Sequence, residues 1–291
     1  MKDREQAPVV IIGTARSGTN MLRNVLSSLS GFVTWPCDEI PYIWRYGNRD
    51  HPNDEFQPEL ARPEVCAYIN RAFERIRTDH SQTVIEKTCA NSLRVGFVDR
   101  VLPEARFLVI SRDGYDTIAS AMKRWTSGFD LRYSMAKARY IPAGDIPAYG
   151  FRYLRNRLKQ IGSPEKRLPV WGPVFEDMLS LPKTVSVAEM AALQWKRCIE
   201  KTNLDLAGIS RERFLRLTYE DFVADPERHV ERILDFLCMT MPADAIHAAI
   251  SDVHSSSVGK AFSTLPAEDR KVIAEIVSSV DVTHHQSEQS C

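Results

Sequence analysis

Residues Val9 to Leu26 read VVIIGTARSGTNMLRNVL, an apolar run that gives way to a short polar loop and resumes at helical spacing. The run from Val9 to Ile12 predicts a short buried strand. From Met21 to Leu29 the apolar residues recur three and four positions apart, which predicts a helix. A strand, a tight loop and a helix form the front half of a βαβ unit. The opening of the chain therefore favours an α/β fold with the loop at the carboxyl end of a strand.

Later segments repeat the alternation of strands and helices. Strands are predicted at Thr83 to Ile85, Arg106 to Ile110 and Arg213 to Phe222, and helices at Tyr115 to Trp125 and Asp225 to Leu237. The last helix has an aspartate at the capping position and a proline at the first helical position, a strong start signal. Strands that alternate with helices predict a three-layer α/β fold, with a central parallel sheet flanked by helices.

The 291 residues and their 44% hydrophobic content suit one large α/β domain. We predict a single domain over residues 1–291, with a helical and loop insertion at about 126–185 and a frayed C-terminal tail. The 38 basic and 38 acidic residues balance, which argues against a nucleic-acid binder held by bulk charge. No apolar run near the N-terminus approaches the ~20 residues of a membrane span, so we expect a cytoplasmic protein without stable membrane insertion. The six cysteines form no CxxC pair, and we expect no metal site.

The loop from Gly13 to Asn20, GTARSGTN, has the GxxxxG frame of a phosphate-binding loop, which makes the predicted fold P-loop-like. Thr19 stands where nucleotide kinases carry a lysine. A glycine-rich turn that enters a helix presents backbone N–H groups and the positive end of the helix dipole to an anion. Arg16 is the one residue within the loop that adds a full positive charge. The alternative is an ordinary strand-to-helix turn with a solvated arginine.

A second segment, FLVISRDGYDTIASAMKRW, places Arg112 at the carboxyl end of a predicted strand. Ser120 and Arg124 lie four residues apart on the helix that follows, and therefore on one helix face. Parallel strands end at one edge of the sheet, so these residues are expected to face the ligand of the first loop. The guanidinium fork matches phosphate oxygens, which predicts a second phosphate site.

The two segments resemble motifs of the sulfotransferases that use 3′-phosphoadenosine 5′-phosphosulfate (PAPS). ARSGTN resembles the PRSGTT-like loop that holds the 5′-phosphosulfate, and RDGYDTIAS resembles the strand, loop and helix that hold the 3′-phosphate. TYEDFVADP and SSSVGKAFSTL resemble a later junction and a late loop that closes over the cofactor. Ala15, Asn20 and Gly114 are mild departures. The resemblance implies PAPS as sulfuryl donor, 3′-phosphoadenosine 5′-phosphate (PAP) as product, no metal, and a donor site made of Arg16, Ser17, Gly18, Thr19, Asn20, Arg112, Ser120, Arg124, Tyr219, Ser257 and Lys260.

The same resemblance indicates the catalytic residues. IEKTCANSL resembles the family segment whose lysine reaches the sulfuryl group, so Lys87 joins Arg16 as a catalytic cation. Glu39 follows the first helix where many relatives carry a catalytic glutamate. Its apolar neighbours predict partial desolvation and a raised pKa, as a general base requires. Glu86 is the second candidate for the base, and it can equally orient Arg16 or Lys87. Alternatively, Asp38 or Glu39 caps the short helix suggested by EIPYIW.

The acceptor side is less defined. Residues 123–167 hold eleven basic residues against three acidic ones, which fits steering of the anionic donor, binding of an acidic acceptor, or a solvated helix face. Trp171 and the aromatic cluster around Tyr42 are candidate acceptor walls. We expect a carbohydrate hydroxyl as acceptor, with a peptide tyrosine, a lipid or a small natural product as alternatives. A degenerate P-loop kinase and a non-catalytic PAP-binding protein are the competing functions. The sequence does not indicate an oligomeric state.

Overall fold

The computed structural model describes residues 7–126, 135, 137–147, 170–182, 184–260 and 264–280. The predicted insertion at 126–185 is therefore described in part, and its described residues include two single turns of 3-10 helix, η4 (Ala143–Asp145) and η5 (Met178–Ser180). The predicted frayed tail, residues 281–291, lies outside the described residues.

A five-stranded sheet forms the centre of the molecule, and all its strand pairs are parallel. The order is β2-β3-β1-β4-β5, from β1 (Val9–Ile12), β2 (Phe32–Val33), β3 (Thr83–Lys87), β4 (Arg106–Ser111) and β5 (Phe214–Thr218). Every residue of β1 and β3 is buried, as expected for central strands of a parallel sheet covered on both faces. With β1 between β3 and β4, the loops after these strands meet at one edge of the sheet.

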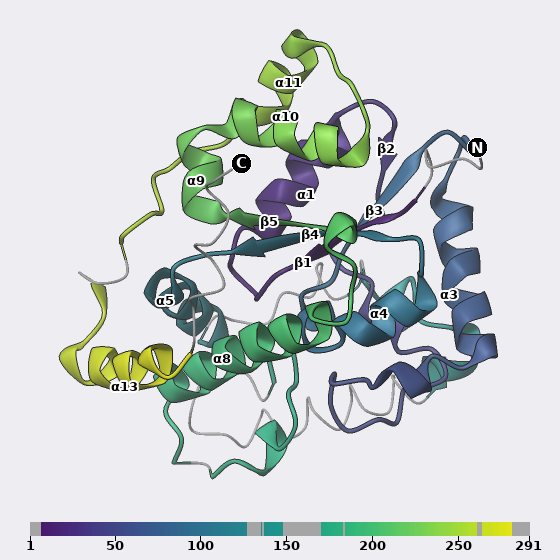
Figure 1. Cartoon of the computed structure of the whole chain (residues 1–291). Coiled ribbons are helices and arrows are strands. Elements are labelled where there is room, and N and C mark those ends of the chain that lie inside the picture. The colour runs from purple at the N-terminus through teal and green to yellow at the C-terminus, as the bar shows by residue number, and fades with distance from the viewer. Residues whose placement is uncertain are drawn as a thin grey trace.

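Helices cover both faces of the sheet (Figure 1). One layer holds α1 (Thr19–Ser28), α9 (Tyr219–Ala224), α10 (Pro226–Leu237) and α11 (Ala243–Ile250). The other holds α3 (Pro63–Ile76), α4 (Val95–Val101), α5 (Gly114–Trp125), α8 (Val187–Leu206) and α13 (Ala267–Ser278). Alternate side chains of β1 sort accordingly: Val9 and Ile11 pack in the core with α1, and Val10 and Ile12 pack in the core with α3 and α4. The predicted three-layer α/β fold is confirmed.

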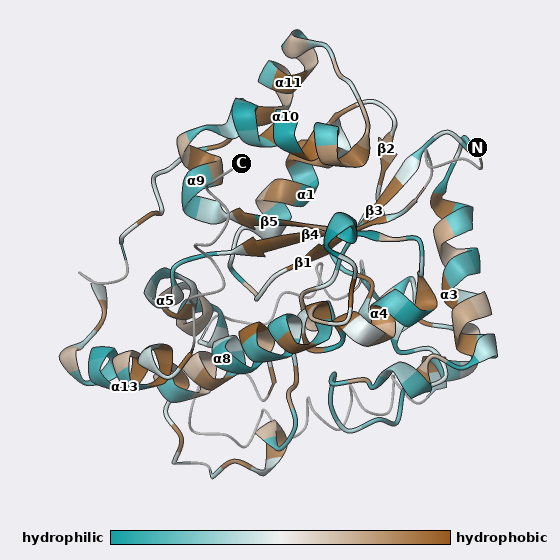
Figure 2. Cartoon of the chain, in the orientation of Figure 1, coloured by the Kyte–Doolittle hydropathy of each residue, from teal (hydrophilic) through white to brown (hydrophobic). Residues whose placement is uncertain are grey.

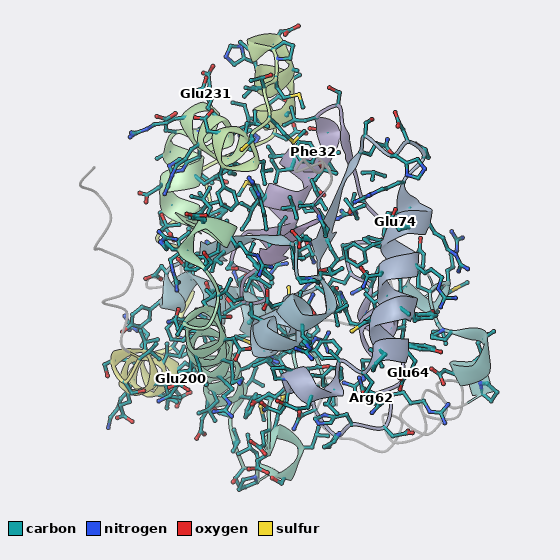
Figure 3. The ribbon with its side chains drawn as sticks, turned by 45° about the vertical axis from the view of Figure 1, so that its right-hand side comes forward. Phe32, Arg62, Glu64, Glu74, Glu200 and Glu231 are labelled. Atoms are coloured by element: carbon teal, nitrogen blue, oxygen red, sulfur yellow. The ribbon has the colours of Figure 1, made fainter. Side chains whose placement is uncertain are left out.

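The helices turn apolar faces toward the sheet and polar faces outward (Figure 2). Glu74 on α3 and Glu231 on α10 are exposed and point away from the core (Figure 3). The predicted start signal of α10 is confirmed, because the side chain of Asp225 accepts a hydrogen bond from the backbone N–H of Arg228. Asp113 caps α5 in the same way by accepting from the backbone N–H of Asp116.

The predicted strand from Arg213 to Phe222 is wrong in its second half. The strand β5 ends at Thr218, whose side chain accepts a hydrogen bond from the backbone N–H of Asp221 and so caps α9. The aromatic residues Tyr219 and Phe222 favour a strand by propensity, but here they form the buried face of a helical turn. A short helix therefore begins at the sheet edge where the strand was expected to continue.

Candidate active site

A cavity of about 850 Å³ opens where the loops after the strands converge. Segments from the whole length of the chain line it, including the loop after β1, the residues after β3, helix α5, residues 170–173 and the loop near residue 257. Most of the predicted site residues are brought together on its wall: Arg16, Gly18, Thr19, Asn20, Glu39, Lys87, Arg112, Ser120, Arg124, Tyr219, Ser257 and Lys260. Ser17 and Glu86 are not among the lining residues.

The loop after β1 is held in a conformation that few residue types adopt. Arg16 has φ 77° and Gly18 has φ 93°, both in the left-handed region. A Cβ atom on Gly18 would also lie 2.4 Å from Cδ2 of Tyr219, so only glycine fits there. Ser17 is fully buried, and its hydroxyl donates to the Thr14 carbonyl at 2.8 Å. Ser17 therefore shapes the loop from within, and the first turn of α1 lies at the cavity wall, where the positive end of the helix dipole favours an anion.

Arg112 lies at the end of β4, where several segments meet. Its Nη2 donates to the Ser257 carbonyl at 2.6 Å and to Oδ2 of Asp116 at 3.2 Å. Its guanidinium lies over the Tyr219 ring, 4.5 Å from the centroid, and the Tyr219 hydroxyl lies 2.7 Å from Oγ of Ser257. The buried Nε of Arg112 has no hydrogen-bond partner among the described residues. The late loop is thus tied to β4, and one buried donor is left at the cavity.

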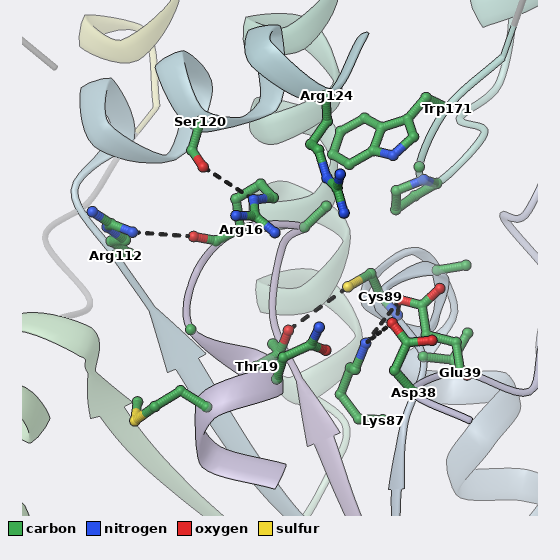
Figure 4. A pocket seen from close by; sticks show the side chains of 18 of the residues that line it. Arg16, Thr19, Asp38, Glu39, Lys87, Cys89, Arg112, Ser120, Arg124 and Trp171 are labelled. Atoms are coloured by element: carbon green, nitrogen blue, oxygen red, sulfur yellow. Dashed lines mark hydrogen bonds and ion pairs between the residues drawn. The ribbon is translucent and has the colours of Figure 1, made fainter. Parts of the chain in front are cut away.

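The three residues predicted for the second phosphate all line the cavity, and two of them contact Arg16. Nε of Arg16 donates to Oγ of Ser120 at 3.0 Å, and Arg112 donates to the Arg16 carbonyl at 3.5 Å. In the view of Figure 4, Arg16 is drawn between Arg112 and Arg124, and Arg124 and Trp171 both line the cavity. Arg112 and Ser120 therefore both contact Arg16, and Arg124 is a further cation on the same cavity wall.

Two carboxylates and two lysines form a cluster at the other end of the cavity, called here the lysine–carboxylate cluster: Asp38, Glu39, Lys87 and Lys137. Nζ of Lys87 lies 3.0 Å from Oε1 of Glu39, and Nζ of Lys137 lies 2.8 Å from Oε2 of Glu39. Asp38 is within 3.8 Å of both ammonium groups. The backbone N–H of Cys89 also donates to Oε1 of Glu39 at 3.3 Å. Sequence reasoning missed Lys137, which was only one of eleven basic residues in its region.

The expectation of a raised pKa at Glu39 is wrong. Burial alone would raise that pKa, but the ammonium groups of Lys87 and Lys137 outweigh it and hold the pKa of Glu39 well below its usual range. The capping alternative is also wrong. The short helix α2 (Pro41–Trp44) has Ile40 at its capping position and no side-chain cap. Glu39 is therefore an ionised carboxylate on the cavity wall, with its side chain 19% exposed.

Glu86 is buried behind the cavity and is 1% exposed. It accepts hydrogen bonds from Oγ1 of Thr88 at 2.5 Å and from Nδ2 of Asn91 at 2.9 Å. Oγ1 of Thr88 in turn accepts from the backbone N–H of Ile40, next to Glu39. Glu86 thus supports the segment that carries Glu39. Burial raises the pKa of Glu86 to about 7, against the lowering effects of Thr88, Trp44, Lys87 and Arg94.

This pKa predicts a pH-dependent contribution to stability. The pKa of Glu86 is higher in the folded chain than the ordinary value of 4.5 that it has in the unfolded chain. The protonated acid therefore contributes fully to the stability of the fold below pH 4.5, and this contribution is lost as the pH rises through about 7. Glutamine mimics the protonated acid at every pH. The free energy of unfolding of the wild type, minus that of Glu86→Gln, should therefore fall by about 2–3 kcal/mol between roughly pH 4.5 and pH 8. Denaturant titrations across this range measure it, with exposed Glu104→Gln as control; equal pH trends for the two variants would refute the assignment.

In residues 7–126 and the later described segments, no group of three or more His, Cys, Asp or Glu side chains is placed to hold a metal ion. None of the helices in these segments is both long enough and apolar enough to cross a membrane.

Comparison with known proteins assigns the family. The model of the sulfotransferase family matches residues 8–163 and 173–243. An uncharacterized protein of Aquifex aeolicus (strain VF5) is 25% identical over 149 residues, which are 43% of this chain and 19% of that protein. The chain thus spans about a fifth of the length of this relative.

Solved structures share the fold at low sequence identity. The sulfotransferase domain from the curacin biosynthetic pathway superposes with a TM-score of 0.52 at 12% identity, covering 96% of this chain and 100% of that domain. The sulfotransferase domain of the Synechococcus PCC 7002 olefin synthase superposes with a TM-score of 0.52 at 16% sequence identity, covering 96% of each chain. A sulfotransferase of Mycobacterium avium gives 0.53 at 14%, covering 95% of this chain and 77% of that one. With its family match over most of its length and this fold, the chain belongs to the sulfotransferase family.

Proposed function

We propose that the protein transfers the sulfuryl group of PAPS to a hydroxyl group of an acceptor. One observation carries the proposal: the glycine-rich loop after β1, Arg112, Ser120 and the Lys87–Glu39 ion pair all line one cavity. The loop and Lys87 would receive the phosphosulfate, Arg112 and Ser120 the 3′-phosphate, and Glu39 the acceptor proton. No metal ion takes part in the proposed reaction.

The charges of the cavity wall fit the donor. Among the residues that the structure describes, the lining holds four acidic residues and seven basic ones: Arg16, Lys87, Arg112, Lys123, Arg124, Lys137 and Lys260. PAPS carries three anionic groups, and arginine binds phosphate through two parallel hydrogen bonds. The orphaned Nε of Arg112 is a buried donor that a phosphate oxygen would satisfy. Gly18 lets the loop pack closely against Tyr219, and the loop leads into the N-terminus of α1, the end of a helix that favours an anion. Asn20, Tyr219, Ser257 and Lys260 complete the proposed donor site.

The chemistry assigned to the chain is an in-line displacement, by analogy with phosphoryl transfer. The bond between sulfur and the phosphate oxygen breaks, and a bond between sulfur and the acceptor oxygen forms. Glu39 takes the acceptor proton, and PAP leaves with the bonding electron pair on its phosphate oxygen. Arg16 and Lys87 stabilise the charge that develops on the transferred group and on the leaving oxygen.

We propose a carbohydrate hydroxyl as the acceptor. Trp171, Tyr42 and Pro173 line the cavity, and flat aromatic walls beside polar groups suit the face of a sugar ring. The wall at Trp171 is firmly held, because Nε2 of Gln194 donates to the carbonyls of Trp171 and Pro173 at 2.9 and 2.7 Å. A peptide tyrosine, a lipid or a small natural product would meet the same walls and are the alternatives.

Transfer of ³⁵S-labelled sulfuryl from PAPS tests the proposal. The wild type is incubated with labelled PAPS and panels of mono- and oligosaccharides, tyrosine peptides, hydroxylipids and small phenols. Labelled product that requires Glu39 supports sulfuryl transfer, and the panel that yields it names the acceptor class. If a non-sugar panel alone is labelled, the carbohydrate assignment is wrong. PAPS that remains intact with every panel would overturn the proposed reaction.

A further inference from the structure

The lysine–carboxylate cluster contains one residue more than sulfuryl transfer needs. Glu39 accepts from Lys87 and the backbone N–H of Cys89 at Oε1, and from Lys137 at Oε2. Both carboxylate oxygens are therefore engaged by charged donors. A carboxylate in this state is ionised, as a base must be, but it takes a proton poorly because two ammonium groups favour its charged form. One of the lysines has to give up its contact before Glu39 becomes an effective base.

The two lysines come from different parts of the fold. Lys87 is the last residue of β3, at the centre of the sheet, and its side chain is 2% exposed. Strand pairing with β1 fixes its backbone, since Lys87 lies opposite Ile11. Lys137 belongs to the connection between α5 and α8, outside the sheet, and its side chain is 11% exposed. Of the two lysines, Lys137 is thus the one that an acceptor molecule entering the cavity can contact and separate from Glu39.

An anion is the group that takes a lysine from a carboxylate at least cost. A neutral acceptor offers Lys137 no charge, so that the lysine stays on Glu39. An acceptor with a carboxylate or sulfate near its reacting hydroxyl replaces the Lys137–Glu39 ion pair with an ion pair between Lys137 and the acceptor. Lys137 therefore keeps an anionic partner, and Glu39 keeps Lys87. Two more cations, Lys123 and Arg124, line the same cavity as Trp171, which is labelled with Arg124 in Figure 4. The acceptor end of the cavity is therefore suited to an anionic molecule.

We propose that Lys137 is a specificity-determining residue. Its ion pair with Glu39 weakens Glu39 as a base, and an acceptor with an anionic group beside its hydroxyl breaks that ion pair by binding Lys137. This inference rests on the proposed function and narrows its acceptor class. Water entering the donor complex alone meets a Glu39 still paired with both lysines. The pairing thus also limits wasteful hydrolysis of PAPS until the right acceptor arrives.

The charged groups around Glu39 support this role. Lys87 and Lys137 contact it, Asp38 lies within 3.8 Å of both lysines, and the Cys89 thiol and the buried Arg94 are further titratable groups that interact with it. Burial raises the pKa of Cys89 to about 12, so the thiol stays neutral. Because Lys87 remains in place, removal of Lys137 raises the pKa of Glu39 toward its ordinary value without abolishing its ionisation at neutral pH.

Hydrolysis of PAPS by water tests the inference without a known acceptor. In this reaction water forms the new bond to sulfur, Glu39 takes its proton, and sulfate and PAP are released. Acetate is the anionic probe, acetamide is its neutral match, and sodium chloride keeps the ionic strength constant. Acetate should raise the hydrolysis rate of the wild type several-fold, while acetamide should leave it unchanged. Lys137→Met should hydrolyse PAPS about tenfold faster than the wild type and should not respond to acetate.

The remaining variants separate position from charge. Lys137→Arg keeps the charge and should keep the acetate response. Arg139→Met removes an exposed charge from the same segment and should behave like the wild type. Thermal melting confirms that each variant is folded. An unchanged or lower hydrolysis rate in Lys137→Met, or an acetate response that survives in it, would overturn the role of Lys137.

Binding of PAP distinguishes an error in the role of Lys137 from an error in the proposed function. If the wild type and Lys137→Met both bind PAP and hydrolyse PAPS equally slowly, the role of Lys137 is wrong and the donor assignment stands. If the wild type does not bind PAP, the proposed function itself is wrong.

Discussion

Replacement of Glu39 by glutamine is expected to lower kcat for sulfuryl transfer by about 10²–10⁴-fold, the usual contribution of a positioned general base. The amide keeps the size of the side chain but cannot take a proton. The affinity for PAP should change little, because Glu39 is assigned to the acceptor proton and not to the donor phosphates. Steady-state release of PAP, measured with an acceptor found in the labelling panels, gives kcat, and calorimetry gives the affinity.

The control for this variant is Glu104→Gln, an exposed glutamate on the surface before β4. It should keep the wild-type kcat. A Glu39→Gln protein that is folded, binds PAP and keeps more than about a tenth of wild-type kcat would remove Glu39 from the role of base. Glu86 would not replace it as the candidate, since Glu86 is buried and does not line the cavity.

Replacement of Lys87 by methionine is expected to lower kcat by about 10²–10³-fold, as does the loss of one group that stabilises charge in a transition state. Methionine preserves most of the buried length of the side chain, which matters at a position 3% exposed. Glu39 keeps its contact with Lys137 in this variant, so its position at the cavity should survive. The expected pattern is a fall in kcat with a smaller change in the KM for PAPS, because the charge that Lys87 meets grows in the transition state.

A matched lysine tests this pattern. Lys196→Met removes a lysine of α8 whose partners are Glu200 and Ser279, outside the cavity lining. Its kcat and KM should equal those of the wild type. If Lys87→Met raises KM and leaves kcat unchanged, Lys87 binds the donor equally in the ground state and the transition state, and its catalytic role is refuted.

The parts of the site that could be predicted from sequence are those whose residues lie close together in the chain. The loop from Gly13 to Thr19 joins a strand to a helix, so its place at the sheet edge follows from local pattern alone. Arg112 and Ser120 follow from the same logic, because a strand end and the next helix turn face one edge. The capped start of α10 was equally local. The error in the predicted end of β5 also has a local cause, because the strand propensity of the residues after Thr218 competes with the helix cap that Thr218 forms.

The parts that could not be predicted depend on contacts between distant segments. The pKa of Glu39 was expected to rise because its sequence neighbours are apolar. Its charge partners, Lys87 and Lys137, lie 48 and 98 residues away in the chain. The excess of basic residues around position 137 was visible, but no periodicity marks which of them faces the cavity. Likewise, only the fold shows that Glu86 is buried away from the cavity lining and that Trp171 lines the cavity together with Arg124.

Calorimetric titration with PAP is the measurement that tests the central claim most directly. The cavity is assigned to a nucleotide with a 3′-phosphate, held by Arg112 and Ser120, and Thr19 replaces the lysine that ATP-binding loops use. The wild type should therefore bind PAP tightly and ATP weakly. Arg112→Ala should weaken PAP binding by about ten- to a hundredfold, the value of a charge-assisted hydrogen bond to phosphate. A wild type that binds no PAP, or that binds ATP as tightly as PAP, would contradict the account.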